Sequence, residues 1–180
     1  MTQRPLGSFV AILAIGLAFT GVLHGAPVIW DGPSITFVKD AFSDWTQLEN
    51  QDRLTDLVWI TRADDKGIFN AKVELGFTHS VSPSGTEWAS GTTAQFASLT
   101  YQPWETWARS VGNPPATPGK NAVLHLIAED IYLDVKFTSW GGPGGGGAFT
   151  YIRSTDPVPE PGSLTMLCLG GLAASIRRRR

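Results

Sequence analysis

The chain has 180 residues, of which 42% are hydrophobic, and a net charge of −2 at pH 7. Five of its 14 basic residues lie in the terminal segments, so residues 27–162 hold 9 basic and 16 acidic side chains and carry a net charge of −7. Phosphate binding needs clustered basic side chains, so this balance excludes nucleic acid as a partner. The single cysteine, Cys168, lies near the C-terminus, which excludes a disulfide scaffold, a cysteine nucleophile and a thiolate metal site from the middle of the chain.

The first 26 residues are organised as a secretory signal peptide. Residues 1–4 are basic, residues 9–19 are almost wholly apolar, and residues 21–26 are mostly small. Such a segment directs export through the secretion translocon and is removed by signal peptidase. Pro27 hinders cleavage after Ala26, so cleavage one residue earlier is an alternative. An uncleaved anchor is disfavoured, because the apolar core is shorter than the roughly 20 residues that span a membrane.

Residues 27–157 are predicted to form one exported domain built mainly of strands. Residues 35–39, 57–61 and 68–75 are rich in β-branched and aromatic side chains, and the polar stretch between the last two predicts a hairpin. A turn is expected at residues 82–85, and residues 96–101 read as a further strand.

The most regular strand pattern comes late in the chain. Residues 122–127 form a predicted strand, and a tight turn at residues 128–129 leads into residues 130–137, where apolar and polar side chains alternate. The apolar positions are Ile131, Leu133, Val135 and Phe137. This alternation is typical of an antiparallel sheet with one buried and one wet face. A glycine-rich loop, residues 141–147, then connects to a last strand, residues 148–153.

Two segments are predicted to be helical. Asp40 is expected to cap a helix that carries Phe42, Trp45 and Leu48, and Pro103 to open a second helix over residues 104–111. In the second helix the apolar side chains recur at helical spacing, and Glu105 and Arg109 are placed to pair four residues apart. Many short strands, frequent Gly and Pro turns and little helix predict an all-β fold: an antiparallel β-sandwich, jelly-roll-like, with one or two short helices.

All seven tryptophans lie between the terminal segments, which invites a sugar-binding interpretation, because indole faces stack on sugar rings. The helical spacing of Trp104 and Trp107 favours core packing instead. Trp140 differs, because the alternation places it on the polar face of its strand beside the glycine loop. It is therefore the candidate for an exposed aromatic platform that contacts glycan.

Candidate catalytic groups are few. Glycoside hydrolysis needs two carboxylates about 5–10 Å apart, whereas Asp130 and Asp134, four residues apart on one strand, are separated by roughly 13 Å. The turn position of Asp64-Asp65 favours solvated side chains over a calcium site. His125 is expected to be partly buried and hydrogen-bonded. The sequence predicts no catalytic residues, no metal site and no cofactor.

The last 23 residues combine three features in order. Pro159, Glu160 and Pro161 precede an uncharged apolar segment, residues 163–176, and four arginines end the chain: Arg177, Arg178, Arg179 and Arg180. Arginines after an apolar helix stay in the cytoplasm, which places the Pro-Glu-Pro motif at the outer face of the inner membrane. An ordinary C-terminal membrane anchor is the alternative interpretation.

Residues 158–180 resemble the PEP-CTERM tail of exported proteins in Gram-negative bacteria. The resemblance implies an exosortase-type membrane peptidase as partner, with cleavage near the motif. It also implies release to the cell surface or extracellular matrix, since genes of this family often lie beside exopolysaccharide genes. We therefore expect an exported, non-catalytic surface or biofilm-matrix protein associated with exopolysaccharide. A carbohydrate-binding module that uses Trp140, or a glycan-active enzyme, are the alternatives.

Overall fold

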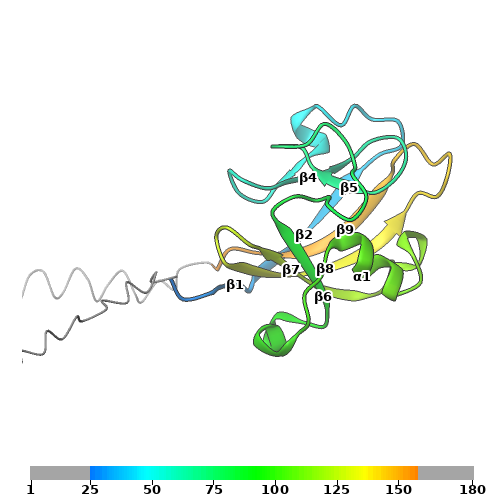
Figure 1. The fold of residues 1–180 in the computed structure, drawn as a ribbon. Helices are drawn as coiled ribbons and strands as arrows, with labels where there is room; N and C mark the ends of the chain where they lie inside the picture. The colour runs from blue at the N-terminus through cyan, green and yellow to red at the C-terminus, as the bar shows by residue number, and fades with distance from the viewer. Residues whose placement is uncertain (1–24, 158–180) are drawn as a thin grey trace, which may run out of the picture.

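The computed structural model describes residues 25–157. The Pro-Glu-Pro motif, the apolar helix at 163–176, the terminal arginines and residues 1–24 of the expected signal peptide lie outside the described residues. Two sheets of mainly antiparallel strands face each other, as expected for an all-β sandwich (Figure 1). The larger sheet holds β1 (Val28–Trp30), β2 (Gly32–Lys39), β6 (Thr86–Ser90), β7 (Asn121–Leu126), β8 (Ile131–Trp140) and β9 (Phe149–Thr155). The smaller sheet holds β3 (Asp52–Arg53), β4 (Trp59–Arg62) and β5 (Ile68–Asn70).

In the larger sheet, the four consecutive strands β6 to β9 lie next to one another. The order of this sheet is β2-β9-β8-β7-β6, and β1 pairs in parallel with the start of β8. The predicted meander of β7, β8 and β9 is confirmed, as is the hairpin of β4 and β5. This order corrects the jelly-roll expectation, because β6 to β9 form a simple meander in one sheet, whereas a jelly roll consists of two Greek keys.

The core lies between the two sheets and under one helix, α1 (Trp104–Ser110). Leu133, Val135 and Phe137 of β8 are buried, which confirms the predicted alternation. Trp107 of α1 is also buried, and it stacks on Trp88 of β6 with ring centroids 5.7 Å apart. Trp104 and Trp107 are therefore core residues, as their helical spacing indicated. Among residues 25–157, no helix is long and apolar enough to cross a membrane.

The helix expected after Asp40 is absent from this part of the domain. The chain turns instead, because the amide and hydroxyl of Ser43 donate to the Asp40 carbonyl and the Asp44 carboxylate accepts bonds from Thr46. Local side-chain bonds of this kind compete with helix formation. Only a short 3₁₀ turn follows, Leu48–Asn50, and the Phe42 side chain is 71% exposed.

Residues 96–101 do not form the predicted strand. Thr93–Ser98 is a 3₁₀ helix that lies on the outer face of the larger sheet. Its first residue is fixed by a distant group, since the amide and hydroxyl of Thr93 donate to the Asp134 carboxylate at 2.7 and 3.0 Å. Phe96 then packs on Tyr132 of β8. A contact between residues 41 positions apart leaves no local pattern in the sequence.

The strand predicted over residues 68–75 ends early, at Asn70. The Asn70 side-chain amide donates to the carbonyls of Leu57 and Ser84, and its oxygen accepts from the Trp59 amide. These bonds turn the chain away from the sheet, and Leu75 is consequently 93% exposed. A third 3₁₀ segment, Pro114–Ala116, lies within the expected surface loop at residues 113–119.

Candidate functional site

Trp140, the residue singled out for glycan contact, lies on the core side of its strand and not on the polar side. Phe137 pairs with Tyr151, but Trp140 pairs with Phe149, so β8 contains one extra residue at a bulge between Phe137 and Ser139. A bulge of one residue reverses the faces beyond it. Trp140 therefore shares the face of Phe137, and its indole stacks on Trp104 at 5.5 Å. The ring remains half-buried, so it is not a free-standing platform.

A pocket of about 420 Å³ lies beside this indole, and we call it the Trp140 pocket. It is bordered by the ends of β4 and β8, the start of α1, the hairpin between β4 and β5, and the loop after β8. Its apolar wall consists of Phe77, Trp104 and Trp140. Its charged and ionisable side chains are Arg62, Asp65, Lys66, His79, Glu105 and Arg109. The volume falls in the range of about 300–1,000 Å³ common for small-ligand sites.

The walls of the pocket are closely packed and rich in proline. A side chain at Gly67 would place its first carbon 2.5 Å from the rings of both Phe77 and Trp104, so glycine permits the close packing of the hairpin against α1. Three prolines form part of the rim: Pro114, Pro115 and Pro143. Proline has a fixed φ angle, so little conformational entropy remains to be lost when a ligand binds.

Arg62 lies beneath the pocket with only 3% of its surface exposed. Its Nε donates to the Lys66 carbonyl at 2.8 Å, and its Nη1 donates to the carbonyls of Gly141 and Ala148 at 2.8 and 3.0 Å. The guanidinium carbon is 4.0 Å from the centroid of the Trp140 ring, within range of a cation–π interaction. Burial lowers the pKa of Arg62 to about 10, although the nearby charge of Asp65 opposes that shift.

Glu105 on α1 is the carboxylate of the pocket that accepts the most hydrogen bonds. It accepts hydrogen bonds from Arg109 at 2.5 Å, from the Ser80 amide at 2.8 Å and from the His79 ring at 3.0 Å. Burial alone would raise the pKa of Glu105, but these hydrogen bonds outweigh it and hold the pKa at about 2, below the usual 4.5. The predicted pairing of Glu105 with Arg109 is confirmed.

Protonation of Glu105 is expected to destabilise the domain in acid. A carboxylate with a depressed pKa stabilises the fold above its unfolded value, and this contribution is lost as the pH falls from about 4.5 to about 2. We expect a loss of about 1–2 kcal/mol, reduced by the exposure of His79 and Arg109. Urea unfolding at pH 7, 4.5 and 2.5 measures it. Glu105→Gln should flatten the pH dependence in this window, and an unchanged slope in that variant would contradict the assignment.

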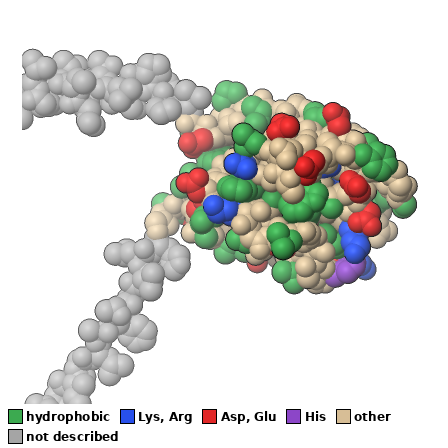
Figure 2. All heavy atoms as spheres, turned by 90° about the horizontal axis from the view of Figure 1, so that it is seen from above, with side chains coloured by type: hydrophobic (Ala, Val, Ile, Leu, Met, Phe, Trp, Pro, Cys, Tyr) green, Lys and Arg blue, Asp and Glu red, His purple; other side chains and the backbone are tan. Residues whose placement is uncertain are grey.

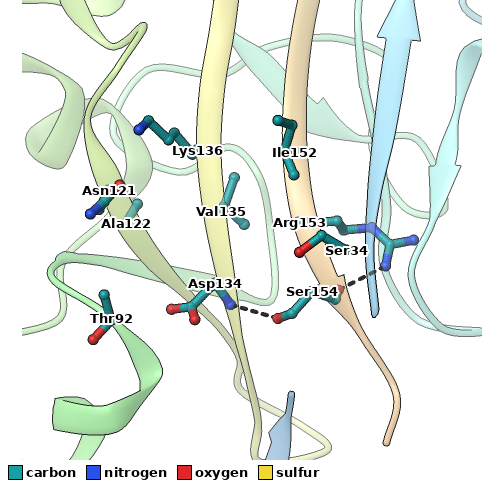
Figure 3. Close-up of a pocket in the computed structure, with 10 residues that line it drawn as sticks. All are labelled: Ser34, Thr92, Asn121, Ala122, Asp134, Val135, Lys136, Ile152, Arg153 and Ser154. Carbon is teal, nitrogen blue, oxygen red and sulfur yellow. Dashed lines mark hydrogen bonds between the residues drawn. The ribbon is translucent and has the colours of Figure 1, made fainter. Parts of the chain in front are cut away.

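A smaller hollow of about 190 Å³ lies on the outer face of the larger sheet (Figure 3). The Asp134 carboxylate there is engaged by Thr93, and the Asp134 amide donates to the Ser154 hydroxyl at 2.9 Å. Figure 3 also shows the Arg153 side chain directed away from Asp134. The polar groups of this hollow mainly hold strands together, so it is the weaker candidate site.

His125 lies on the same outer face and is partly buried, as predicted. Its ring is nearly parallel to that of Tyr132, with centroids 4.2 Å apart, and its Nε2 lies 3.1 Å from an Asp130 carboxylate oxygen. The carboxylates of Asp64 and Asp65 lie in the turn between β4 and β5. Within the described part of the chain, no three or more His, Cys, Asp or Glu side chains gather closely enough to hold a metal ion.

The charge of the domain surface is dispersed. Figure 2 shows one face on which acidic side chains are scattered among polar and apolar ones, with fewer basic side chains between them. No cationic surface of the kind that binds a nucleic-acid backbone is visible on this face.

Comparison with known proteins gives a match for the C-terminal segment. The family model of the PEP-CTERM protein-sorting motif matches residues 157–180, the segment that contains Pro159, Glu160, Pro161 and the terminal arginines. No curated protein and no solved structure matches the chain. The family match covers the tail alone, and it supports export and exosortase processing in general. The chain is therefore an exported protein that carries a C-terminal PEP-CTERM sorting motif.

Proposed function

We propose that this protein is a non-catalytic component of the cell surface or biofilm matrix that associates with exopolysaccharide through the Trp140 pocket. The sorting motif at residues 157–180 carries the proposal. Tails of this kind pass through the inner membrane, are cut by an exosortase-type peptidase and accompany exopolysaccharide production. The mature domain would then be released to the surface or matrix without its arginine cluster.

The position of the Trp140 pocket supports this role. Trp140 pairs with Phe149 at the start of β9, whereas the tail continues from the other end of β9, after Thr155. Six residues of strand separate these points, or about 20 Å. The first described residues lie at the same end of the domain as the C-terminal end of β9 (Figure 1). A tethered or assembled domain would therefore present the pocket away from its point of attachment.

The chemistry of the pocket favours binding over hydrolysis. A glycosidase needs one carboxylic acid that remains protonated near neutral pH, which requires a raised pKa. Glu105 has the opposite property, because its hydrogen-bonded carboxylate has a pKa of about 2. Asp65, the other carboxylate of the pocket, is exposed to solvent. A glycan-active enzyme is therefore the less favoured alternative.

Cosedimentation with exopolysaccharide purified from the native host tests this proposal. Trp140→Leu is expected to weaken binding about tenfold, since truncation of a central aromatic contact commonly costs more than 1 kcal/mol. Trp59→Leu is the matched control, because Trp59 is also half-buried and also lies under an arginine, with the Arg53 guanidinium carbon 3.9 Å from its ring centroid. Thermal melts verify that both variants fold.

The outcomes separate the candidate functions. Loss confined to Trp140→Leu supports the pocket as the binding site. Equal losses in both variants would reject the pocket, and no binding by the wild type would reject association with exopolysaccharide. Saturable binding of short soluble oligosaccharides would identify a carbohydrate-binding module, whereas binding to the intact polymer alone would identify a matrix component.

A further inference from the structure

The two arginines that are buried in this domain have opposite surroundings. Arg153 on β9 is 7% exposed and meets the Asp52 carboxylate through two hydrogen bonds, Nε at 2.7 Å and Nη2 at 2.8 Å. Arg62 is more deeply buried, yet within residues 25–157 it forms no ion pair. A buried cation without a carboxylate is costly unless a partner reaches it. Lys39 is also buried without an ion pair among these residues, but Arg62 is the one of the two that lines the Trp140 pocket.

One nitrogen of Arg62 remains available. Nε and Nη1 are held by backbone carbonyls, whereas Nη2 donates to no group in the described part of the chain. Within residues 25–157, two buried side-chain atoms have no hydrogen-bond partner, Trp104 Nε1 and Glu129 Oε2. Arg62 Nη2 is not one of them, so this nitrogen is not fully buried. It therefore reaches solvent-accessible space. The fixed backbone bonds position the guanidinium before a ligand arrives, so little reorganisation is needed on binding.

The pocket is locally cationic within an acidic domain. Its basic side chains are Arg62, Lys66 and Arg109, against the carboxylates of Asp65 and Glu105. Glu105 is already occupied by Arg109, and Asp65 lies too far from Arg62 to form an ion pair among the described residues. Arg62 and the exposed Lys66 are therefore the cations left for a ligand.

We propose that the Trp140 pocket binds an acidic sugar unit, such as a hexuronate within a polysaccharide, with its carboxylate at Arg62 and its ring against the aromatic wall. The wall supplies apolar contact to the carbon face of the sugar, and the guanidinium supplies a charge-assisted hydrogen bond to the carboxylate. Lys66 adds attraction at the rim. This assignment rests on the proposed association with exopolysaccharide and specifies which sugar chemistry that association uses.

Matched ligands test the carboxylate directly. Titration calorimetry is performed on residues 27–157 attached to their native tail, in detergent, with oligogalacturonate, with a mannuronate oligosaccharide, and with carboxyl-reduced forms of both. We expect each acidic oligosaccharide to bind at least fivefold more tightly than its reduced form. We also expect this difference to shrink between 50 and 300 mM NaCl, because exposed charge interactions are screened.

Variants that remove one positive charge show which side chains produce the preference for acidic oligosaccharides. Lys66→Gln should weaken acidic oligosaccharides roughly two- to fivefold and leave the reduced forms unchanged. Lys136→Gln, which removes the same charge from the outer face of the larger sheet, should change neither. Arg62→Gln should abolish the preference for acidic ligands, and circular dichroism verifies its fold. If that variant does not fold, the affinities of Lys66→Gln and Lys136→Gln for the acidic oligosaccharides are compared instead, and a loss confined to Lys66→Gln supports the inference.

Three results would overturn the inference. Equal affinity for acidic and reduced oligosaccharides would remove the role of the carboxylate, while binding to host exopolysaccharide would still stand. Binding of neither acidic oligosaccharide would reject an acidic sugar as the ligand. Equal effects of Lys66→Gln and Lys136→Gln would show that the net charge of the domain, and not the pocket, sets the preference.

Discussion

Replacement of Asp52 by asparagine is expected to lower the free energy of unfolding by about 3–5 kcal/mol, because it leaves a buried guanidinium without its carboxylate. Asp52 on β3 accepts two hydrogen bonds from Arg153 and one from the Tyr151 hydroxyl, at 2.6 Å. The three side chains join the smaller sheet to the larger one across 99 to 101 positions of sequence. Urea unfolding at pH 7 measures the loss.

Asp56→Asn is the matched control for this substitution. Asp56 follows β3 closely but is exposed, so its replacement is expected to change the stability by less than about 0.5 kcal/mol. A stable Asp52→Asn variant would mean that Arg153 finds another partner and that the two sheets do not depend on this ion pair. The result bears on function as well, because Arg62 and Trp140 reach the Trp140 pocket from different sheets.

Replacement of Pro159, Glu160 and Pro161 by alanine is expected to prevent nearly all processing of the tail. Proline disfavours helical backbone and alanine favours it, so the substitution removes both the side chains of the motif and its conformational preference. The variant should accumulate in the inner membrane with residues 158–180 still attached. Immunoblots of membrane and extracellular fractions measure this, with Asp156→Ala as a control at an exposed residue outside the motif. Normal release of the triple variant would show that processing does not read these residues.

The elements set by local chemistry were predictable from the sequence. Helix α1 follows from Pro103, the helical spacing of its tryptophans and the pairing of Glu105 with Arg109. The alternation of β8 follows from a strand that has one buried face. The sorting motif was the most readily recognised feature, because a linear signal depends on the order of residues and not on the fold.

The elements set by distant contacts were not predictable. Thr93 begins a 3₁₀ helix because Asp134 binds it, and Asn70 ends a strand by bonding to two separate segments, residues 57–59 and Ser84. The bulge in β8 had the largest consequence, since one extra residue moved Trp140 from the expected polar face to the core face. Nothing in a single sequence marks a bulge without a glycine.

The Trp140 pocket combines both kinds of information. Trp140 was identified from its type and its position beside a glycine loop, although the expected exposure was wrong. Arg62 was not identified, because in the sequence it is one arginine at the end of a strand. Its significance arises only from burial, from three backbone carbonyls and from the absence of a carboxylate partner within residues 25–157.

The intact mass and location of the wild-type protein in its native host test the central claim most directly. The account predicts a species outside the cell that lacks both the signal peptide and the segment after the Pro-Glu-Pro motif. Such a species would confirm that residues 157–180 act as a sorting signal and not as a permanent anchor. A protein that retains Arg180 and remains in the inner membrane would contradict this account, and it would place the Trp140 pocket in the periplasm.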